Sequence, residues 1–118
     1  MRFLRWLLLI PIILLILFVG FTIWAYTPLG PMPEALSALQ SNTFVQVTEG
    51  PWIVFEPTGN MVDTGLIIYP GGRVDPRSYA PIAQQLSAEG YLVAIVPMPF
   101  NLAVFGSGRA SDIINGFP

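Results

Sequence analysis

Residues 64–97 read TGLIIYPGGRVDPRSYAPIAQQLSAEGYLVAIVP, and this stretch decides the fold class. Two short apolar runs, residues 66–69 and 91–96, flank a glycine-containing loop and a segment with helical periodicity. Runs that are apolar at every position suit strands covered on both faces, as parallel strands between helices are. Because parallel neighbours need a crossover of a dozen or more residues, the spacing predicts a β-loop-α-β unit.

The helix between the two runs is expected to pack one apolar face on the sheet. Four residues recur at helical spacing on that face: Tyr79, Ile82, Ala83 and Leu86. Gly90 supplies a left-handed C-terminal cap, and either Asp75 or Ser78 can cap the N-terminus. Ser78 is the preferred cap, because Pro81 then lies in the first turn, where its missing N–H costs nothing.

The loop between the first strand and the helix, residues 70–76 (PGGRVDP), is where a binding site is expected. Glycines at the carboxyl end of a parallel strand allow backbone N–H groups to face a ligand, and open α/β sheets bind ligands at that edge. A tight turn that requires positive φ explains the same glycines without a ligand. The local sequence leaves both interpretations open.

The N-terminal segment is the most apolar part of this 118-residue chain, which is 53% hydrophobic and 10% charged. Residues 6–26 carry no charge and are long enough to cross a hydrocarbon core of roughly 30 Å as one helix. Arg2 and Arg5 precede the run and no positive charge follows closely, which places residues 1–5 in the cytoplasm. We expect a single-pass signal anchor in the cell membrane, with the lipid bilayer as partner and the domain on the outer face.

A cleaved signal peptide is the competing interpretation of this segment. Its apolar core would be about 7–15 residues long and would precede a small-residue cleavage site. The core found here is longer, and residues 23–26 (IWAY) form a poor cleavage site. These two features favour the uncleaved anchor.

The residues after the anchor divide into a linker and an α/β domain at 34–118. Residues 27–33 contain three prolines and a glycine and form the linker. Residues 34–40 predict a brief amphipathic helix with Leu36 and Leu39 on its packing side. Apolar residues around 44–47 and 52–55 then predict an antiparallel hairpin at a sheet edge.

The residues after the second buried strand form an apolar loop and a last helix. The loop at 98–106 either lines a pocket, with Asn101 and Phe105 as candidates, or covers the core, which is the favoured interpretation. The helix at 109–115 is expected to turn three residues inward: Ala110, Ile113 and Ile114. Two parallel strands and a hairpin leave an open sheet edge, so we expect an incomplete α/β domain of marginal stability.

Three phrases of the sequence resemble the α/β-hydrolase family, of the kind related to dienelactone hydrolases. They are LIIYPGGRVDPRSY at 66–79, GYLVAIVPMP at 90–99 and NLAVFG at 101–106. Together they are similar to a bacterial membrane-anchored branch of the family, over about residues 34–118. The resemblance implies that the complete protein hydrolyses a small-molecule acyl substrate such as an ester or lactone.

In that family the loop after the third strand contributes one backbone N–H of the oxyanion hole. The resemblance transfers this role to four candidate residues, among which the choice stays open: Gly71, Gly72, Arg73 and Val74. A preorganised N–H there would stabilise the negative charge that develops on the substrate oxygen. Arg73 could add positive charge, although an arginine solvated in the loop is the favoured interpretation.

The catalytic residues of the family have no counterpart in this sequence. The nucleophile elbow G-x-S-x-G should follow a later strand, with the acid and the histidine after it. Ser107 precedes the expected last helix instead, and the chain has no His to act as its base. We therefore assign no catalytic residue and interpret the chain as an N-terminal fragment that is inactive alone.

Two alternatives come from other functional classes. One is a small membrane interaction or structural protein, with the open sheet edge completed by a partner chain. The other is an anion- or phosphate-binding module built from Gly71, Gly72 and a helix N-terminus near Ser78, without the usual phosphate motifs. With no Cys and no His we expect no metal site and no cofactor, and five arginines at net charge −2 argue against nucleic acid.

Overall fold

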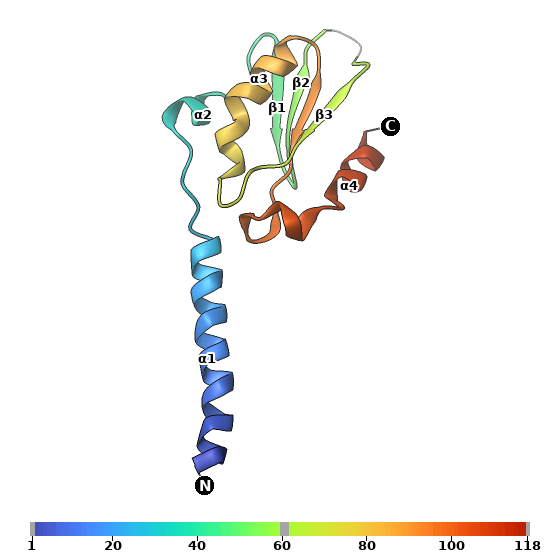
Figure 1. Ribbon diagram of the computed structural model, residues 1–118. Helices are drawn as coiled ribbons and strands as arrows, with labels where there is room; N and C mark the ends of the chain where they lie inside the picture. Colours follow the sequence, from blue (N-terminus) through green and yellow to red (C-terminus); the bar gives the residue numbers. More distant parts are fainter. Residues whose placement is uncertain (1, 60–61, 118) are drawn as a thin grey trace.

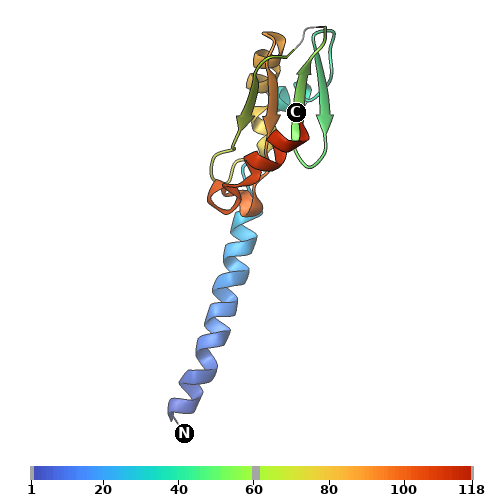
Figure 2. The same cartoon turned by 90° about the vertical axis from the view of Figure 1, so that its right-hand side faces the viewer.

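The computed structural model describes residues 2–59 and 62–117. It measures 74 × 32 × 17 Å, because helix α1 (Arg2–Ala25) stands out from one end of a small α/β part (Figures 1 and 2). The strands within these residues are β1 (Val45–Glu49), β2 (Ile53–Pro57), β3 (Gly65–Ile68) and β4 (Leu92–Ile95). The other helices are α2 (Pro33–Ser37), η1 (Pro76–Tyr79), α3 (Ala80–Ala88), η2 (Pro99–Asn101), η3 (Ala103–Gly106) and α4 (Arg109–Gly116).

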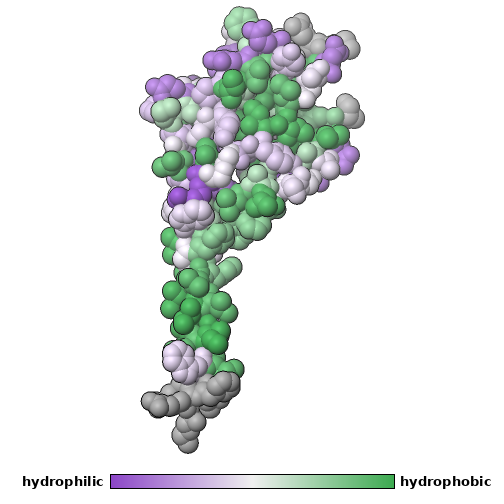
Figure 3. All heavy atoms as spheres, in the orientation of Figure 1, coloured by the Kyte–Doolittle hydropathy of each residue, from purple (hydrophilic) through white to green (hydrophobic). Residues whose placement is uncertain are grey.

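From Trp6 onward, helix α1 carries its large apolar side chains exposed, which gives the extended hydrophobic surface seen in Figure 3. Its segment Trp6–Ala25 has 20 residues and a mean hydropathy of 2.9. Twenty helical residues rise about 30 Å, which matches a hydrocarbon core. The helix is therefore long and apolar enough to cross a membrane, a test that an N-terminal signal sequence also passes.

The strands form one sheet in the order β1-β2-β4-β3. β1 and β2 make the predicted antiparallel hairpin with β1 at the edge, and β2 also pairs antiparallel with β4. β3 and β4 are parallel neighbours, with Leu66 opposite Val93. The predicted β-loop-α-β unit is confirmed, and both of its strands run toward the end of the domain that meets α1 (Figure 1).

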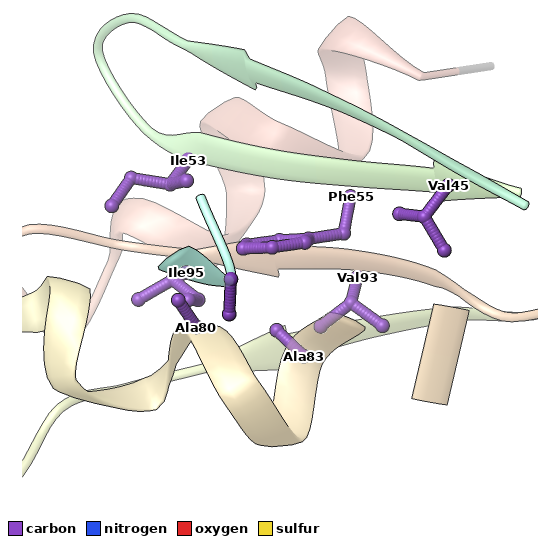
Figure 4. Close-up of a cluster of buried hydrophobic side chains, with 8 residues drawn as sticks. Val45, Ile53, Phe55, Ala80, Ala83, Val93 and Ile95 are labelled. Carbon is purple, nitrogen blue, oxygen red and sulfur yellow. The ribbon is translucent and has the colours of Figure 1, made fainter. Parts of the chain in front are cut away.

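One face of the sheet packs against α3. Because side chains alternate along a strand, every second residue of β2 and β4 reaches this face. The buried cluster there comprises Ala38, Val45, Ile53, Phe55, Ala80, Ala83, Val93 and Ile95. Figure 4 shows the hairpin residues on one side, Ala80 and Ala83 of α3 on the other, and the two β4 residues between them.

The opposite face of the sheet is covered by α4 (Figure 2). Its buried cluster is smaller and comprises Ala94, Val96, Met98 and Ile113. The Tyr69 hydroxyl donates to the Ser107 carbonyl (3.1 Å) and accepts from the Ala110 N–H (2.8 Å), which fixes the start of α4 beside the end of β3. The side chains of β3 stay partly exposed on both faces, so this edge of the sheet is only half covered.

The buried face of α3 differs from the predicted one. Ala80, Ala83 and Ser87 are buried, whereas Ile82 is about half exposed. Tyr79 belongs to the preceding 3-10 helix, which advances three residues per turn and shifts the phase of the pattern. The inward placement of Ile82 was wrong for that reason, and small side chains make the close contact with the sheet.

The N-terminal cap of this helical segment is Asp75, not the preferred Ser78. The Asp75 carboxylate accepts a hydrogen bond from the Arg77 N–H at 2.9 Å. Because η1 starts at Pro76, the unpaired N–H groups of the first turn arise before Ser78. The other cap is confirmed, since Gly90 has φ 106°.

Two further residues that were predicted to face the core, Leu36 and Ile114, are also exposed. In α2, Ala35 is buried while Leu36 is exposed, because this short helix meets the domain through Ala35 and through Ala38 just after its end. In α4, Ile113 is buried and Ile114 is exposed, because the helix contacts the sheet along one narrow stripe.

The apolar loop after β4 covers the core only in part. Met98 and Gly106 are buried, but Val104 and Phe105 point away from the core and are 77% and 55% exposed. The favoured interpretation as core cover was therefore wrong for Val104 and Phe105, whereas Ala103 and Gly106 of η3 do pack inward.

Candidate functional site

The candidate site is the loop that joins β3 to η1, at the carboxyl edge of the two parallel strands. This is the edge at which open α/β sheets bind ligands. Figure 1 shows that the same edge faces the end of α1, so the loop and the N-terminal helix meet. The linker takes part in this contact, because Leu29 pairs with Val74 in an isolated parallel bridge.

Within the loop, residues 71–74 form a tight turn. The Val74 N–H donates to the Gly71 carbonyl at 3.2 Å, and Arg73, the third residue of the turn, has φ 54°. Positive φ at the third position is the pattern of a type II turn, which usually places Gly or Asn there. An arginine in this conformation is strained, and such strain tends to be kept at functional positions.

Three of the four candidate amides already donate hydrogen bonds within the protein. The Gly71 N–H donates to the Tyr79 hydroxyl (2.9 Å), the Arg73 N–H to the Asn101 carbonyl (2.8 Å), and the Val74 N–H closes the turn. Among the residues that the structure describes, the exposed Gly72 N–H has no protein acceptor. Of the four candidates, Gly72 is thus the amide that is free to bind an incoming oxygen.

The Arg73 side chain lies against α1 rather than free in solvent. Its Nε donates to the Trp24 carbonyl (3.0 Å) and one terminal nitrogen donates to the Thr27 carbonyl (2.8 Å). The guanidinium carbon lies 4.4 Å from the centroid of the Trp24 ring, a cation–π contact. The expectation of a solvated arginine was wrong, because Arg73 supplies donors to a carbonyl at the C-terminal end of α1 and to the Thr27 carbonyl just beyond it.

Of the pocket-lining candidates, Asn101 contacts α1 directly, and Phe105 contacts Phe100, which packs on α1. The Asn101 amide donates to the Ala25 carbonyl at 2.8 Å, which satisfies a further carbonyl at the end of the helix. The Phe105 ring packs on the Phe100 ring, with centroids 5.6 Å apart. These two candidates and the loop are thus brought together, in a junction between the domain and α1.

A separate hollow of about 550 Å³ lies between β3 and α4. Its lining includes Leu66, Ile67, Ala94, Ile113, Ile114 and Phe117. It is an open surface of mixed polarity on the half-covered side of the sheet, because Glu56, Asp63 and Thr64 line it as well. No candidate site residue from the sequence lines this hollow.

Arg77, in the first turn of η1, is paired with a carboxylate of the loop. Arg77 and Asp75 form a salt bridge of 2.7 Å. The side-chain hydrogen bond from Arg77 holds the pKa of Asp75 below its ordinary value and raises the pKa of Arg77. Arg73 and Arg77 thus both bind groups of the protein itself, which leaves the anion-binding alternative without structural support from them.

Ser107 gains no catalytic surroundings from the fold. It is exposed between η3 and α4, and its carbonyl accepts the hydrogen bond from Tyr69. The sequence has no His that could act as its base. Within the described part of the chain, no group of His, Cys, Asp and Glu is arranged to hold a metal ion.

The sequence reasoning missed the junction between the loop and α1. A signal for it was present: the last carbonyls of any helix need donors, and residues 27–33 carry no charged side chain to supply them. The Thr27 hydroxyl donates to the Ile23 and Trp24 carbonyls, and the remaining donors are Arg73 and Asn101, which lie 46 or more residues after the groups they bind. Their pairing with this helix depends on the tertiary fold.

The chain was compared with protein families, curated proteins and solved structures. Residues 65–118 match the model of the Alpha/beta hydrolase family. The matched stretch begins at β3 and includes the loop, α3, β4 and α4. No curated protein and no solved structure matches the chain.

Proposed function

We propose, from the family match over residues 65–118, that the chain is the N-terminal part of a membrane-anchored α/β hydrolase and donates one oxyanion-hole N–H, that of Gly72. The observation that carries the proposal is the free Gly72 amide in the loop after β3, the loop that supplies such a donor in this fold. The complete protein would hydrolyse an ester or related acyl substrate. The dienelactone-hydrolase-like, membrane-anchored branch is part of this proposal.

The half-covered sheet supports the fragment interpretation. β3 has an open edge and partly exposed apolar side chains, and the hollow beside it is lined by apolar residues of β3 and α4. A further strand paired with β3 would bury both. Such a strand could carry the nucleophile elbow to the edge where Gly72 lies.

The test of Gly72 uses the complete protein, obtained by reading the coding sequence beyond the Pro118 codon. Gly72→Pro removes the free N–H, and proline suits the second position of a type II turn. We expect kcat on a p-nitrophenyl ester to fall by about 10²–10³, the usual loss of one oxyanion donor. Gly72→Ala is the matched control: it keeps the N–H, and its Cβ would meet Leu102 at an ordinary 3.5 Å.

Equal kcat for Gly72→Pro and the unchanged protein, with equal melting temperatures, would refute the assignment. The chain of residues 1–118 alone should show no esterase activity. Turnover that disappears in Ser107→Ala would overturn the view that the nucleophile lies elsewhere.

The anchoring part of the proposal rests on α1. Its apolar surface, the Arg2 and Arg5 flank and the poor cleavage site support an uncleaved helix with a cytoplasmic N-terminus. The chain should stay with membranes after alkaline carbonate extraction and should keep its full mass. A product that starts near Tyr26 would establish the signal-peptide alternative.

A second candidate function is a membrane interaction protein whose sheet a partner chain completes. The open β3 edge and the hollow favour it as much as they favour a further strand of the same chain. The coding sequence distinguishes the two: a G-x-S-x-G after an apolar strand and a later His support the hydrolase. A stop codon directly after Pro118 supports the interaction protein.

A further inference from the structure

The segment formed by η2 and η3, residues 99–106, is in contact with the membrane-length part of α1. The Phe100 ring lies 5.9 Å from the Phe21 ring and 5.4 Å from the Tyr26 ring, centroid to centroid. Phe21 lies inside the apolar stretch Trp6–Ala25, about 6 Å from its end at 1.5 Å per residue. The segment therefore reaches the level of the last turn of the hydrophobic helix.

The backbone of this segment is held in a strained form that keeps Phe100 at the helix. Phe100 and Asn101 have φ 54° and 51°; asparagine adopts this left-handed region comparatively often, whereas a bulky residue such as Phe100 rarely does. The Asn101 bond to Ala25 and the Phe100 ring contacts offset this cost. The contact with α1 is thus built into the segment.

The outer surface of the segment is apolar. Residues 99–106 read PFNLAVFG and contain no charged side chain, and the amide of Asn101, their polar residue, is occupied by α1. Val104 and Phe105 are exposed, and so is Leu29 in the neighbouring linker. Figure 3 shows this hydrophobic surface continuing from α1 onto the adjoining end of the domain.

We propose that residues 99–106 lie in the interfacial layer of the bilayer that α1 crosses, with Phe100, Val104 and Phe105 against lipid. The inference rests on the proposed anchoring of α1. Aromatic side chains favour this layer, where apolar surface meets the headgroups. The occupant of the exposed apolar surface is the lipid itself, because the surface is continuous with that of the membrane helix.

The position of residues 99–106 in the interfacial layer defines the class of substrate for the proposed site. The Arg73 N–H bonds to the Asn101 carbonyl, and the Cβ position of Gly72 lies 3.5 Å from Leu102. The free amide of Gly72 therefore lies beside the lipid-contacting segment. An amphiphile with an acyl chain would reach it from the bilayer without crossing water.

The test uses the full chain in phosphatidylcholine vesicles. The protein has no cysteine, so Val104→Cys gives a single site for an environment-sensitive nitrobenzoxadiazole dye. Phe44→Cys is the matched control, because Phe44 is similarly exposed (69% against 77%) and precedes β1, which starts at the far end of the domain from α1 (Figure 1). Carbonate extraction of each preparation reports the anchoring separately.

We expect the dye at position 104 to emit at shorter wavelength than at position 44. It should be quenched by lipids with a nitroxide near the headgroup end of the acyl chain, and it should lose quenching by aqueous iodide. Equal iodide quenching at both positions in carbonate-resistant protein would overturn the inference and leave the anchoring intact. Protection from iodide without quenching by nitroxide lipid would show that protein covers the segment, which also overturns it.

Release of the chain by carbonate would overturn the inference together with the proposed anchor. The role assigned to the Gly72 amide would remain testable by the Gly72→Pro variant. Failure of that variant to lose activity would in turn leave the lipid contact of residues 99–106 unaffected.

Discussion

At the scale of single residues, Arg73 and Gly72 of the loop after β3 have different roles. Arg73 adopts a strained backbone conformation and donates to two carbonyls of the N-terminal helix region. Gly72, its neighbour, keeps its N–H free among the described residues. A turn held to α1 in this way is a preorganised setting for the free amide.

The side chain of Arg73 should stabilise the junction between the loop and α1. Arg73→Ala removes two charge-assisted hydrogen bonds and the contact with Trp24, at a cost of about 1–3 kcal/mol. We expect faster chymotrypsin cleavage after Tyr26 or Leu29 in detergent micelles. Arg109→Ala is the control, because Arg109 bonds to the Pro97 carbonyl and not to α1; equal cleavage rates in the two variants would contradict the role of Arg73.

The salt bridge of Asp75 with Arg77 should make stability depend on pH in the acid range. The pKa of Asp75 is lower in the folded chain than its ordinary value near 3.8. The pair therefore stabilises the fold above about pH 4, and this contribution is lost as the pH falls through the lowered pKa. Because Arg77 is 46% exposed, solvent screening limits the contribution of the pair to stability to under about 1 kcal/mol.

Asp75→Asn tests this contribution, because asparagine keeps the capping acceptor and removes the charge. Denaturant unfolding should show a small loss of stability at pH 7 and a weaker decline between about pH 4 and pH 2. Asp112→Asn, at an exposed position on α4, serves as the control. If the free energy of unfolding of Asp75→Asn falls in acid as steeply as that of the unchanged protein, other carboxylates cause the fall.

At the scale of elements, the hairpin and the parallel strand pair followed from the sequence, whereas the strand order, the β2–β4 pairing and the buried side of each helix did not. Runs apolar at every position indicated β3 and β4, and the hairpin followed from apolar strands about a turn. The predicted inward residues Leu36, Ile82 and Ile114 are exposed instead. Which side a short helix buries depends on how closely it approaches the sheet, and small residues decide that here.

Helix α4 offers a direct test of its buried side. Ile113→Ala should lower the free energy of unfolding by about 2–5 kcal/mol, because it leaves a cavity against Ala94, Val96 and Met98. Ile114→Ala, at a 62% exposed position, should change it by about 0.5 kcal/mol or less. The fluorescence of Trp52, which packs on this cluster, is a suitable probe of unfolding. Equal losses of unfolding free energy in the two variants would show that α4 packs on the sheet through a different side.

At the scale of the whole molecule, the helix and the domain are joined by more than a linker. Three kinds of contact connect them: the Leu29 bridge, the hydrogen bonds from Arg73 and Asn101, and the aromatic contacts of Phe100. The carboxyl edge of the sheet therefore faces the end of α1. In a membrane-anchored protein this places the proposed oxyanion donor toward the bilayer.

The domain should depend on this junction for its stability. Residues 33–118 without α1 lose several hydrogen bonds worth about 1 kcal/mol each, and their sheet stays half covered. We expect this piece to melt over a broad range and at a lower temperature than the full chain in detergent micelles. A sharp transition at the same temperature, by calorimetry, would show that the junction contributes little.

The sequence by itself determined the apolar helix, the β-loop-α-β unit, the hairpin and the loop at which a site is expected. These features depend on periodicity and on residue type, which are local properties. Only the tertiary structure decided that Gly72 carries the free amide and that Arg73 and Asn101 bind the end of α1. The physical reason is that hydrogen-bond satisfaction is set by groups such as Tyr79, Asn101 and Trp24, which the fold brings to the loop from distant parts of the chain.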